Sequence, residues 1–218
     1  MIAIDGPAGA GKSTVAKGVS HILGIHCLDT GALFRALAYH TIRLGKSPKI
    51  EAEALQAVKD VALEIRIDDD GQHTLINGED VTPYIRTPEV SQGASDIGVI
   101  PEVRRILTEK VRRIAQTMSL VVDGRDVGTA MLPDADYKFF LTADVEERAR
   151  RRKLELQKQG KDEPFEKVLS EMIARDKTDS TRKIAPLCKA EDAIVVDSTH
   201  IDADEVIKNM IEIIRGER

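Results

Sequence analysis

The sequence predicts an α/β fold in which helices cover a five-stranded, doubly wound parallel sheet. Five short strand-like runs support this, at residues 2–4, 25–28, 120–122, 138–141 and 193–196. Several of these runs are unbroken and apolar, which is typical of strands that are buried on both faces. Segments with a helical spacing of apolar residues lie between the runs. The 218 residues, 42% of them hydrophobic, suffice for one such domain with small inserted lobes.

The helices follow from the spacing of apolar residues along the chain. The first is expected from about residue 12 to 23, because Val15, Val19, Ile22 and Leu23 share one face. Further helices are predicted at residues 31–44, 101–117, 146–160, 165–175 and 203–215. The helices at 146–160 and 165–175 are very polar, so we expect them to form a mobile hairpin rather than part of the core.

One segment departs from the alternation of strands and helices. Residues 63–67 alternate between apolar and polar side chains, and the dipeptides Asp70-Gly71 and Asn77-Gly78 flank a second short run at 74–76. These dipeptides are strong turn formers between strands. The pattern predicts a small antiparallel insert between the second and third strands of the main sheet.

Composition excludes several classes of function. The net charge is −5, whereas a general nucleic-acid binder needs a broad basic face. Cys27 and Cys188 match no metal-binding spacing, so we expect reduced core thiols, and we expect the five histidines to be surface or capping residues. No apolar run approaches the roughly 20 residues that a membrane span needs. These features predict a cytoplasmic protein without a membrane or nucleic-acid polymer as partner.

A phosphate-binding motif follows the first predicted strand. The pattern G-x-x-x-x-G-K-[ST] is complete in Gly6, Pro7, Ala8, Gly9, Ala10, Gly11, Lys12 and Ser13, and Thr14 continues it into the helix. In such a loop the backbone N–H groups turn inward around phosphates, and the helix N-terminus adds positive charge. Lys12 then reaches the β- and γ-phosphates, and the Ser13 hydroxyl binds Mg²⁺. A glycine-rich turn that binds nothing does not account for the complete motif at this junction, so the sequence predicts nucleotide binding.

The residues after the third strand point to a kinase. A GTPase carries an N-K-x-D motif, which is absent, and an ATPase motor pairs the loop with a strand that ends in Asp-Glu. Here the strand ends in Asp123-Gly124-Arg125-Asp126. We expect Asp123 to hold Mg²⁺ through water, and Arg125 to bind a second anion instead of a hydrolytic water. The pattern therefore favours transfer of a phosphoryl group to a phosphorylated small molecule.

Arginines are placed where a second anion would need them. Arg35 and Arg125 follow predicted strands at the carboxyl end of the sheet, where ligands of such folds bind. Further arginines occur at positions 104, 148, 150, 151, 152, 175 and 182. For those between 148 and 152 an alternative stays open, in which they are solvated helix residues that pair with Glu146 and Glu147.

Four stretches together resemble the bacterial cytidylate kinase family of nucleoside monophosphate kinases. They are Ile4–Thr14, Leu28–Arg35, Asp123–Thr129, and Arg175-Asp176 continuing through Asp179 and Arg182 to Leu187. Their order and spacing are similar to those of the family over essentially the whole chain. The D-G-R-D-x-G-T run combined with R-D-x-x-D-x-x-R is much more specific than the phosphate loop alone.

The resemblance implies an adenylate-kinase-like P-loop NTPase fold in a single kinase domain, residues 1–218. It implies a core at about 1–45, 98–143 and 184–218, a monophosphate-binding insert at about 46–97, and an Arg-rich lid at about 144–183. The implied reaction transfers the γ-phosphoryl group of ATP to CMP or dCMP, with Mg²⁺ bound to ATP. The family also leads us to expect a monomer.

The resemblance also implies a role for individual residues. The loop residues 6–14 would bind ATP, and Lys12, Arg125 and Arg182 would stabilise the charge that is transferred. Arg148, Arg151 and Arg152 would belong to a lid that closes over ATP and excludes water. The residues that would contact CMP are Thr30, Arg35, Ser95, Arg104, Arg125, Asp126, Arg175, Asp179 and Arg182.

Within that acceptor site the roles differ by chemistry. Arg35, Arg125 and Arg182 would hold the phosphate, and Arg175 and Asp179 would approach the sugar and phosphate. Ser95, Arg104 and Asp126 would contact the cytosine edge, where a carboxylate accepts from the exocyclic amine but is repelled by O4 of uracil. Two positions depart from the family, in which Tyr is frequent at Phe34 and Ser at Thr30.

Two other functions stay open on the sequence alone. Another small P-loop kinase, acting on UMP or shikimate, would share the loop and the lid but would not need Asp126 and Arg104 to face a base. A regulator that senses ATP without transferring its phosphate would bind ATP and show no acceleration by any monophosphate.

Overall fold

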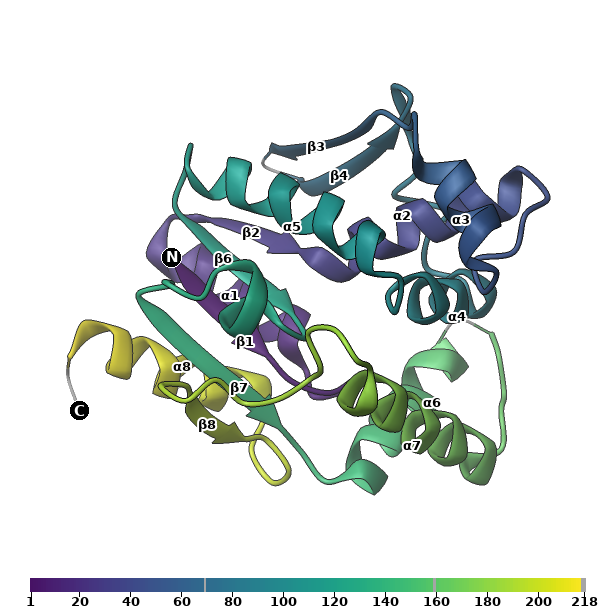
Figure 1. The fold of residues 1–218 in the computed structure, drawn as a ribbon. Helices are drawn as coiled ribbons and strands as arrows, with labels where there is room; N and C mark the ends of the chain where they lie inside the picture. Colours follow the sequence, from purple (N-terminus) through teal and green to yellow (C-terminus); the bar gives the residue numbers. More distant parts are fainter. Residues whose placement is uncertain (69, 159, 217–218) are drawn as a thin grey trace. The chain divides into compact units, whose positions relative to one another are not determined.

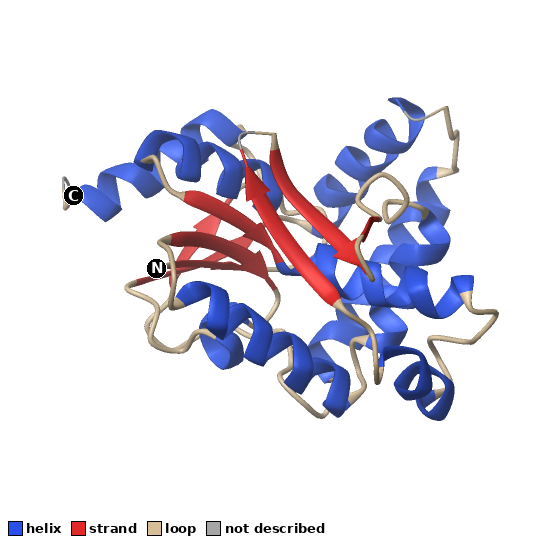
Figure 2. Ribbon diagram, turned by 90° about the horizontal axis from the view of Figure 1, so that it is seen from above, coloured by secondary structure: helices blue, strands red, loops and turns tan. Residues whose placement is uncertain are grey.

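The structure is a computed structural model that describes residues 1–68, 70–158 and 160–216. In these residues the main sheet has five parallel strands, as predicted, and their order is β2-β6-β1-β7-β8 (Figure 1). The strands are β1 (Ile2–Asp5), β2 (His26–Asp29), β6 (Leu120–Gly124), β7 (Tyr137–Thr142) and β8 (Ile194–Asp197). A second sheet is antiparallel and contains β3 (Leu63–Asp68), β4 (Gly71–Ile76) and β5 (Glu79–Asp80), so the predicted insert is confirmed. Figure 2 shows the strands in red and the helices in blue.

The chain divides into two compact units, which are described separately. The first comprises Met1–Ile25 and Val121–Arg218, and the second comprises His26–Leu120. The helices of the first unit are α1 (Lys12–Leu23), α6 (Val145–Lys158), α7 (Phe165–Thr181) and α8 (Ala203–Arg215), together with a π-helix, η1 (Val127–Met131). Those of the second are α2 (Thr30–Arg43), α3 (Glu51–Val58), α4 (Pro88–Ile97) and α5 (Pro101–Ala115).

In the first unit, strand register aligns the ends that carry the phosphate loop. Asp5 of β1 lies beside Gly124 of β6 on one side and beside Phe140 of β7 on the other. The strand interiors are aliphatic and fully buried, as in Ala3 and Val122. Loops that follow these strands therefore leave the sheet at one edge, where ligands of parallel sheets bind.

Helices α1 and α8 pack closely in the same unit because position 18 has no side chain. A Cβ atom added at Gly18 would lie 2.2 Å from Cδ1 of Ile207. The amphipathic α8 buries Val206, Ile207, Met210 and Ile211, and its Asp202 accepts a hydrogen bond from the Glu205 backbone at the N-terminus. One expectation for α1 was wrong, since Ile22 is 48% exposed instead of sharing the buried face.

The second unit joins the small sheet to a group of helices. Pairing between β3 and β4 sets Leu63 opposite Ile76, and both side chains are buried. Helix α4 was not predicted, although its N-terminus has a recognisable signal: Thr87 accepts a hydrogen bond from the Val90 backbone, and Pro88 is the first helical residue.

The cysteines, His40 and the end of α7 differ in part from the expectations. Cys27 and Cys188 are free, as predicted, but Cys188 is exposed and is not a core thiol. His40 is buried instead of lying at the surface. Helix α7 continues to Thr181, six residues beyond the predicted end at Arg175.

Among the described residues, no helix has both the length and the apolarity that crossing a membrane requires.

Candidate active site

The phosphate loop leaves β1 in a backbone conformation that requires glycine. Gly6 has a φ of 149°, and a Cβ atom there would lie 1.9 Å from the backbone oxygen of Leu141. Gly11 has a φ of 90° and directly precedes α1. Side chains are disfavoured at such angles, so the glycines allow the loop to curve at the start of the helix. The loop is therefore built like an anion-binding turn at a helix N-terminus.

Lys12 is held inside this loop. Its side chain is buried, and Nζ donates a hydrogen bond to the backbone oxygen of Pro7 at 2.7 Å. Burial and the nearby positive charge of Arg125 place its pKa well below the usual lysine value, although Asp123 acts in the opposite direction. A buried ammonium among other cations is poorly stabilised, and an anionic ligand would offset the electrostatic cost of its charge. The surroundings of Lys12 are those of a phosphate-binding lysine.

A pair of oxygen ligands lies beside the loop. The Ser13 hydroxyl donates a hydrogen bond to Oδ2 of Asp123 at 2.6 Å. Asp123 is buried near the end of β6. Hydroxyl and carboxylate oxygens are the donors that a hard cation such as Mg²⁺ prefers, so these two residues fit the predicted metal.

Four charged side chains form a network between the residues that follow β6 and the C-terminal end of α7. Arg125 donates from Nε to Oδ2 of Asp179 at 3.0 Å, and Arg182 donates from Nη2 to Oδ1 of Asp126 at 3.2 Å. Nη1 of Arg182 is also 3.8 Å from Oδ1 of Asp179. The structure thus brings these four predicted site residues together, with Arg175 one turn before Asp179 on α7.

The carboxylate at the centre of this network is ionised. Burial alone would raise the pKa of Asp179, but the positive charges of Arg125 and Arg175 outweigh it and hold the pKa below its usual value. Arg182 also donates from Nε to the backbone oxygen of Ala185 at 2.6 Å. Two of the three arginines that are predicted to bind the phosphate, Arg125 and Arg182, are therefore held in place by carboxylates.

The remaining predicted acceptor residues belong to the second unit. Arg35 donates to Oδ2 of Asp29 at 2.7 Å, and Arg86, which the sequence did not single out, donates to the same oxygen at 3.3 Å. Asp29 precedes Thr30, the buried first residue of α2. Ser95 lies on α4 and is half-buried.

Arg104 is fixed by its surroundings in this unit. It is 4% exposed, and Nη1 donates to the backbone oxygen of Gly98 at 2.8 Å. Its guanidinium carbon lies 5.1 Å from the centre of the Phe34 ring. A cation over an aromatic face is favoured, so Phe34 orients Arg104 without the hydroxyl that a tyrosine would bring.

Of the three predicted lid arginines, two are anchored rather than solvated. Arg148 donates to the backbone oxygens of Ala143 at 2.9 Å and Ala8 at 3.0 Å, and pairs with Asp176 of α7 at 2.7 Å. Arg151 donates to the backbone oxygen of Ser198 at 2.6 Å and also to Glu147 at 3.1 Å. Arg150 pairs with Glu146 and Glu147, so the helix pairs of the alternative form as well. The third lid arginine, Arg152, pairs with a glutamate three residues later on its own helix.

Prediction from the sequence missed a cavity beside the phosphate loop. It has a volume of about 520 Å³, and its lining includes Gly11, Thr14, Arg151, Ser198 and Ile201. A signal was available, since the polar run 197–202 connects the last strand to the last helix. Since Ala10 and Gly11 belong to the phosphate loop, the cavity borders that loop at the start of α1.

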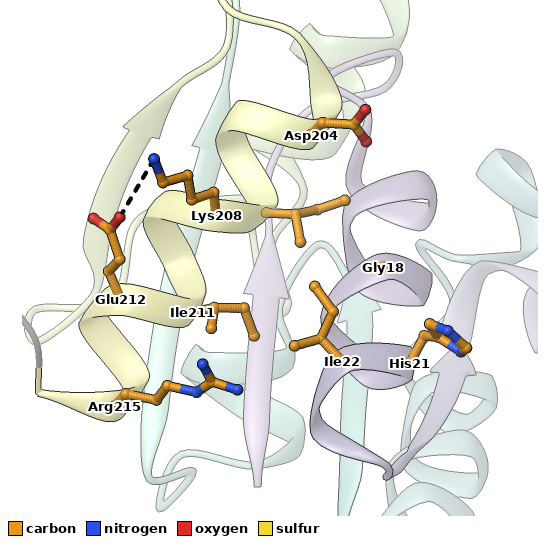
Figure 3. Close-up of a pocket in the computed structure, with 9 residues that line it drawn as sticks. Gly18, His21, Ile22, Asp204, Lys208, Ile211, Glu212 and Arg215 are labelled. Atoms are coloured by element: carbon orange, nitrogen blue, oxygen red, sulfur yellow. Dashed lines mark ion pairs between the residues drawn. The ribbon is translucent and has the colours of Figure 1, made fainter.

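Another cavity, of about 530 Å³, lies between α1 and α8 (Figure 3). Ile22 and Ile211 line it together with charged side chains such as Lys208 and Glu212, which form an ion pair at 3.9 Å. It contains none of the predicted site residues. We therefore assign the chemistry to the edge of the sheet and not to this groove.

Comparison with known proteins agrees with this geometry. The family described as "Cytidylate kinase" matches residues 2–216. The chain belongs to the cytidylate kinase family. It is 48% identical to a cytidylate kinase of Caldanaerobacter subterraneus over 214 residues, covering 98% of this chain and 94% of that protein. It is 46% identical to that of Carboxydothermus hydrogenoformans, covering 98% and 96%.

Cytidylate kinases are ATP-dependent nucleoside monophosphate kinases, so this chain is an enzyme of that class. A shikimate kinase from Bacteroides thetaiotaomicron has the same fold with a TM-score of 0.50, covering 98% of this chain and 97% of that one. At 11% identity this likeness concerns the fold alone, and it gives no support to shikimate as the substrate.

Proposed function

We propose that this enzyme transfers the γ-phosphoryl group of ATP to CMP or dCMP, giving ADP and CDP or dCDP. The observation that carries the proposal is the buried network of Arg125, Asp179, Arg182 and Asp126 beside a complete phosphate loop. Two anionic substrates need concentrated positive charge, and the acceptor base needs a polar partner. The network provides both, because it combines guanidinium groups with a carboxylate.

On the donor side, loop residues 6–14 would hold the phosphates of ATP, with Lys12 on the β- and γ-oxygens. Ser13 would bind Mg²⁺ directly and Asp123 would bind it through water, as their 2.6 Å contact supports. When bound, Mg²⁺ offsets the negative charge of the ATP phosphates. The base of ATP would occupy the cavity lined by Thr14, Arg151 and Ser198.

On the acceptor side, Arg35, Arg125 and Arg182 would bind the monophosphate. Arg175 and Asp179 would contact the sugar and phosphate, and Thr30 would add a hydroxyl at the start of α2. The attacking atom is already a phosphate oxygen, so no side chain has to remove a proton from it. Lys12, Arg125 and Arg182 would then stabilise the charge that develops during in-line transfer.

Recognition of the base would depend on Asp126, Arg104 and Ser95. Asp126 accepts from Arg182, and its carboxylate would also accept from the exocyclic amine of cytosine. UMP carries an acceptor, O4, at that position, so a carboxylate there disfavours it. Arg104 would donate to the acceptor side of the ring, in the orientation that Gly98 and Phe34 impose.

Water must be kept away from the transferred phosphoryl group. Residues 144–183 would form the lid that does this, whereas the core would comprise about 1–45, 98–143 and 184–218, and the insert about 46–97. Support for the lid comes from Arg148, which connects α6 to the loop residue Ala8. Closure of the lid over ATP would hold both substrates in a dry site.

The test is an ADP-release assay with ATP and a panel of CMP, dCMP, UMP, AMP, GMP and shikimate. We expect CMP and dCMP to give the highest kcat/KM. A preference for UMP or shikimate would refute the proposal in favour of another small P-loop kinase. ATP binding without acceleration by any acceptor would instead identify a nucleotide-sensing regulator.

We also infer that the enzyme works as a cytoplasmic monomer that requires Mg²⁺. The net charge of −5 and the two free cysteines agree with a reducing, soluble environment. Light scattering of the purified protein tests the oligomeric state, and titration with EDTA followed by Mg²⁺ or Ca²⁺ tests the metal. A dimer at micromolar concentration, or full activity in EDTA, would refute the respective inference.

A further inference from the structure

A buried carboxylate at the end of β1 is not explained by the roles above. Asp5 is 4% exposed and directly precedes Gly6 of the phosphate loop. Its Oδ1 accepts a hydrogen bond from the backbone N–H of Val127 at 2.8 Å, and its Oδ2 accepts one from Gly128 at 2.7 Å. Both partners lie more than 120 residues away in the chain. Asp5 therefore connects the strand that opens the phosphate loop to a distant segment.

That segment begins immediately after the acceptor-binding pair. Val127 and Gly128 are the first two residues of the π-helix η1, and Arg125 and Asp126 precede them. The first N–H groups of a helix have no partner within it, and a carboxylate is a strong acceptor for them. Asp5 satisfies two of these groups with its two oxygens.

Backbone hydrogen bonds within η1 also hold the residue that precedes it. The carbonyl oxygen of Asp126 accepts from the N–H groups of Ala130 at 2.9 Å and Met131 at 3.1 Å. With Asp5 holding the next two N–H groups, the peptide units on the C-terminal side of Asp126 are held at two points. The direction in which the Asp126 side chain leaves the backbone, toward Arg182, depends on this arrangement.

We propose that Asp5 is a positioning residue for acceptor recognition: by holding the start of η1, it sets the place of Arg125 and Asp126 relative to the phosphate loop. The inference deepens the proposed function and rests on it, because the proposed function assigns contacts with CMP to Arg125 and Asp126. Asp5 itself touches neither substrate and acts through the segment 125–128.

The cost of burying Asp5 supports a role beyond stability. Burial raises the pKa of this carboxyl to about 6, with the charge of Asp126 acting in the same direction, whereas the two backbone hydrogen bonds and Lys12 lower it. An acid whose pKa is raised on folding is disfavoured in its ionised form, so above about pH 6 the charge costs stability. A neutral asparagine would cost the fold less. Its amide, however, has one oxygen that can accept from one of the two N–H groups, whereas its NH₂ group cannot accept from the other.

The test compares Asp5→Asn with Asp136→Asn. Asp136 is an exposed carboxylate that binds the N-terminal amine at the other end of the neighbouring strand, so its variant makes the same chemical change away from the site. For each protein, kcat and KM are measured for ATP, CMP and UMP at pH 8, and the melting temperature is recorded.

We expect Asp5→Asn to lower the ratio of kcat/KM for CMP to that for UMP by about tenfold or more, because one N–H of η1 then faces an amide NH₂ and Asp126 shifts. KM for ATP should change by less than about twofold, and the melting temperature at pH 8 should fall by no more than a few degrees, since a costly charge is removed. Asp136→Asn should leave the ratio unchanged. A residue with only a structural role would not alter selectivity between two acceptors.

The outcomes distinguish failure of the proposed function from failure of the positioning role of Asp5. If the wild-type enzyme does not prefer CMP, the proposed function fails. If it does, and Asp5→Asn keeps the wild-type ratio or raises KM for ATP and CMP alike, only the positioning role is overturned. If Asp5→Asn does not fold, the smaller Asp5→Ser is measured in its place with the same expectation. Failure of both variants to fold would overturn the positioning role, because the fold itself would then require Asp5.

Discussion

Replacement of Arg148 by methionine is the most direct test of how α6 is attached to the phosphate loop. The Arg148 side chain is 6% exposed and makes three interactions in the first unit: with the backbone oxygens of Ala143 and Ala8, and with the carboxylate of Asp176. Methionine preserves much of the apolar stem but removes every donor. Arg152→Met is the matched control, since Arg152 lies on the same helix and its ion pair among the described residues is with a glutamate of that helix.

The size of the effect follows from burial. Removing one partner of a buried ion pair costs about 3–5 kcal/mol in the free energy of unfolding. Asp176 keeps partial access to water, because its side chain is 23% exposed, so we take the lower end of this range, about 3 kcal/mol. The two carbonyl contacts are included in that figure, as they involve the same guanidinium group. Arg152→Met should cost no more than about 0.5 kcal/mol, as for exposed helix pairs.

Urea unfolding followed by circular dichroism measures both free energies, and steady-state kinetics give KM for ATP. We expect Arg148→Met to raise KM for ATP as well, because Ala8 belongs to the phosphate loop. If the two variants lose similar free energy, or if Arg148→Met unfolds like the wild type, Arg148 does not brace the loop. The assignment of α6 as an anchored part of the lid would then be wrong.

Three further predictions concern other parts of the chain. Asp126→Ala should raise KM for CMP by about tenfold or more with little change in KM for ATP, and an equal effect on both substrates would remove Asp126 from base recognition. Gly18→Ala should cost about 1–3 kcal/mol in urea unfolding because its Cβ would lie 2.2 Å from Cδ1 of Ile207, and adding Ile207→Val, which removes Cδ1, should restore most of the loss. The hydrogen bond with Asp80 raises the pKa of His73, so this pair stabilises the small sheet below pH about 6.5 and ceases to do so as pH rises through the higher folded pKa. NMR titration of His73 tests this, and an unchanged pKa in Asp80→Asn would contradict it.

Local signals explain why much of the first unit could be predicted. The loop between β1 and α1 depends on glycines with positive φ, and α1 ends at Gly24 in the left-handed conformation. Helix α8 was predicted from residue 203 to 215 because its apolar spacing is regular, and the structure adds Asp202 as its capping residue. Each of these features is determined by residues within one turn of the chain.

Helices α3 and α4 were missed for the opposite reason. They are only eight and ten residues long, and α4 contains Gly93, which weakens a helical pattern. Gly93 is explained by packing, since a Cβ atom there would lie 3.1 Å from Pro48 and 3.2 Å from the Cβ of Ala38. A close approach between segments that are far apart in the chain leaves no periodic pattern of apolar residues from which the helix could be predicted.

The candidate site shows the same limit at the level of single residues. The resemblance implies that Arg125 and Arg182 bind phosphate, but nothing in the sequence indicates that Asp179 and Asp126 pair with them. These contacts arise because Asp179 on α7 and Arg182 directly after it lie beside the residues that follow β6. A guanidinium group has five N–H donors, so each arginine can pair with a carboxylate and still donate to a monophosphate. In the proposed function, an exocyclic amine would donate to the same Asp126 carboxylate that pairs with Arg182, whereas O4 of uracil would be repelled by it. Selectivity for cytosine would thus follow from the same ion pairs that hold the arginines in place.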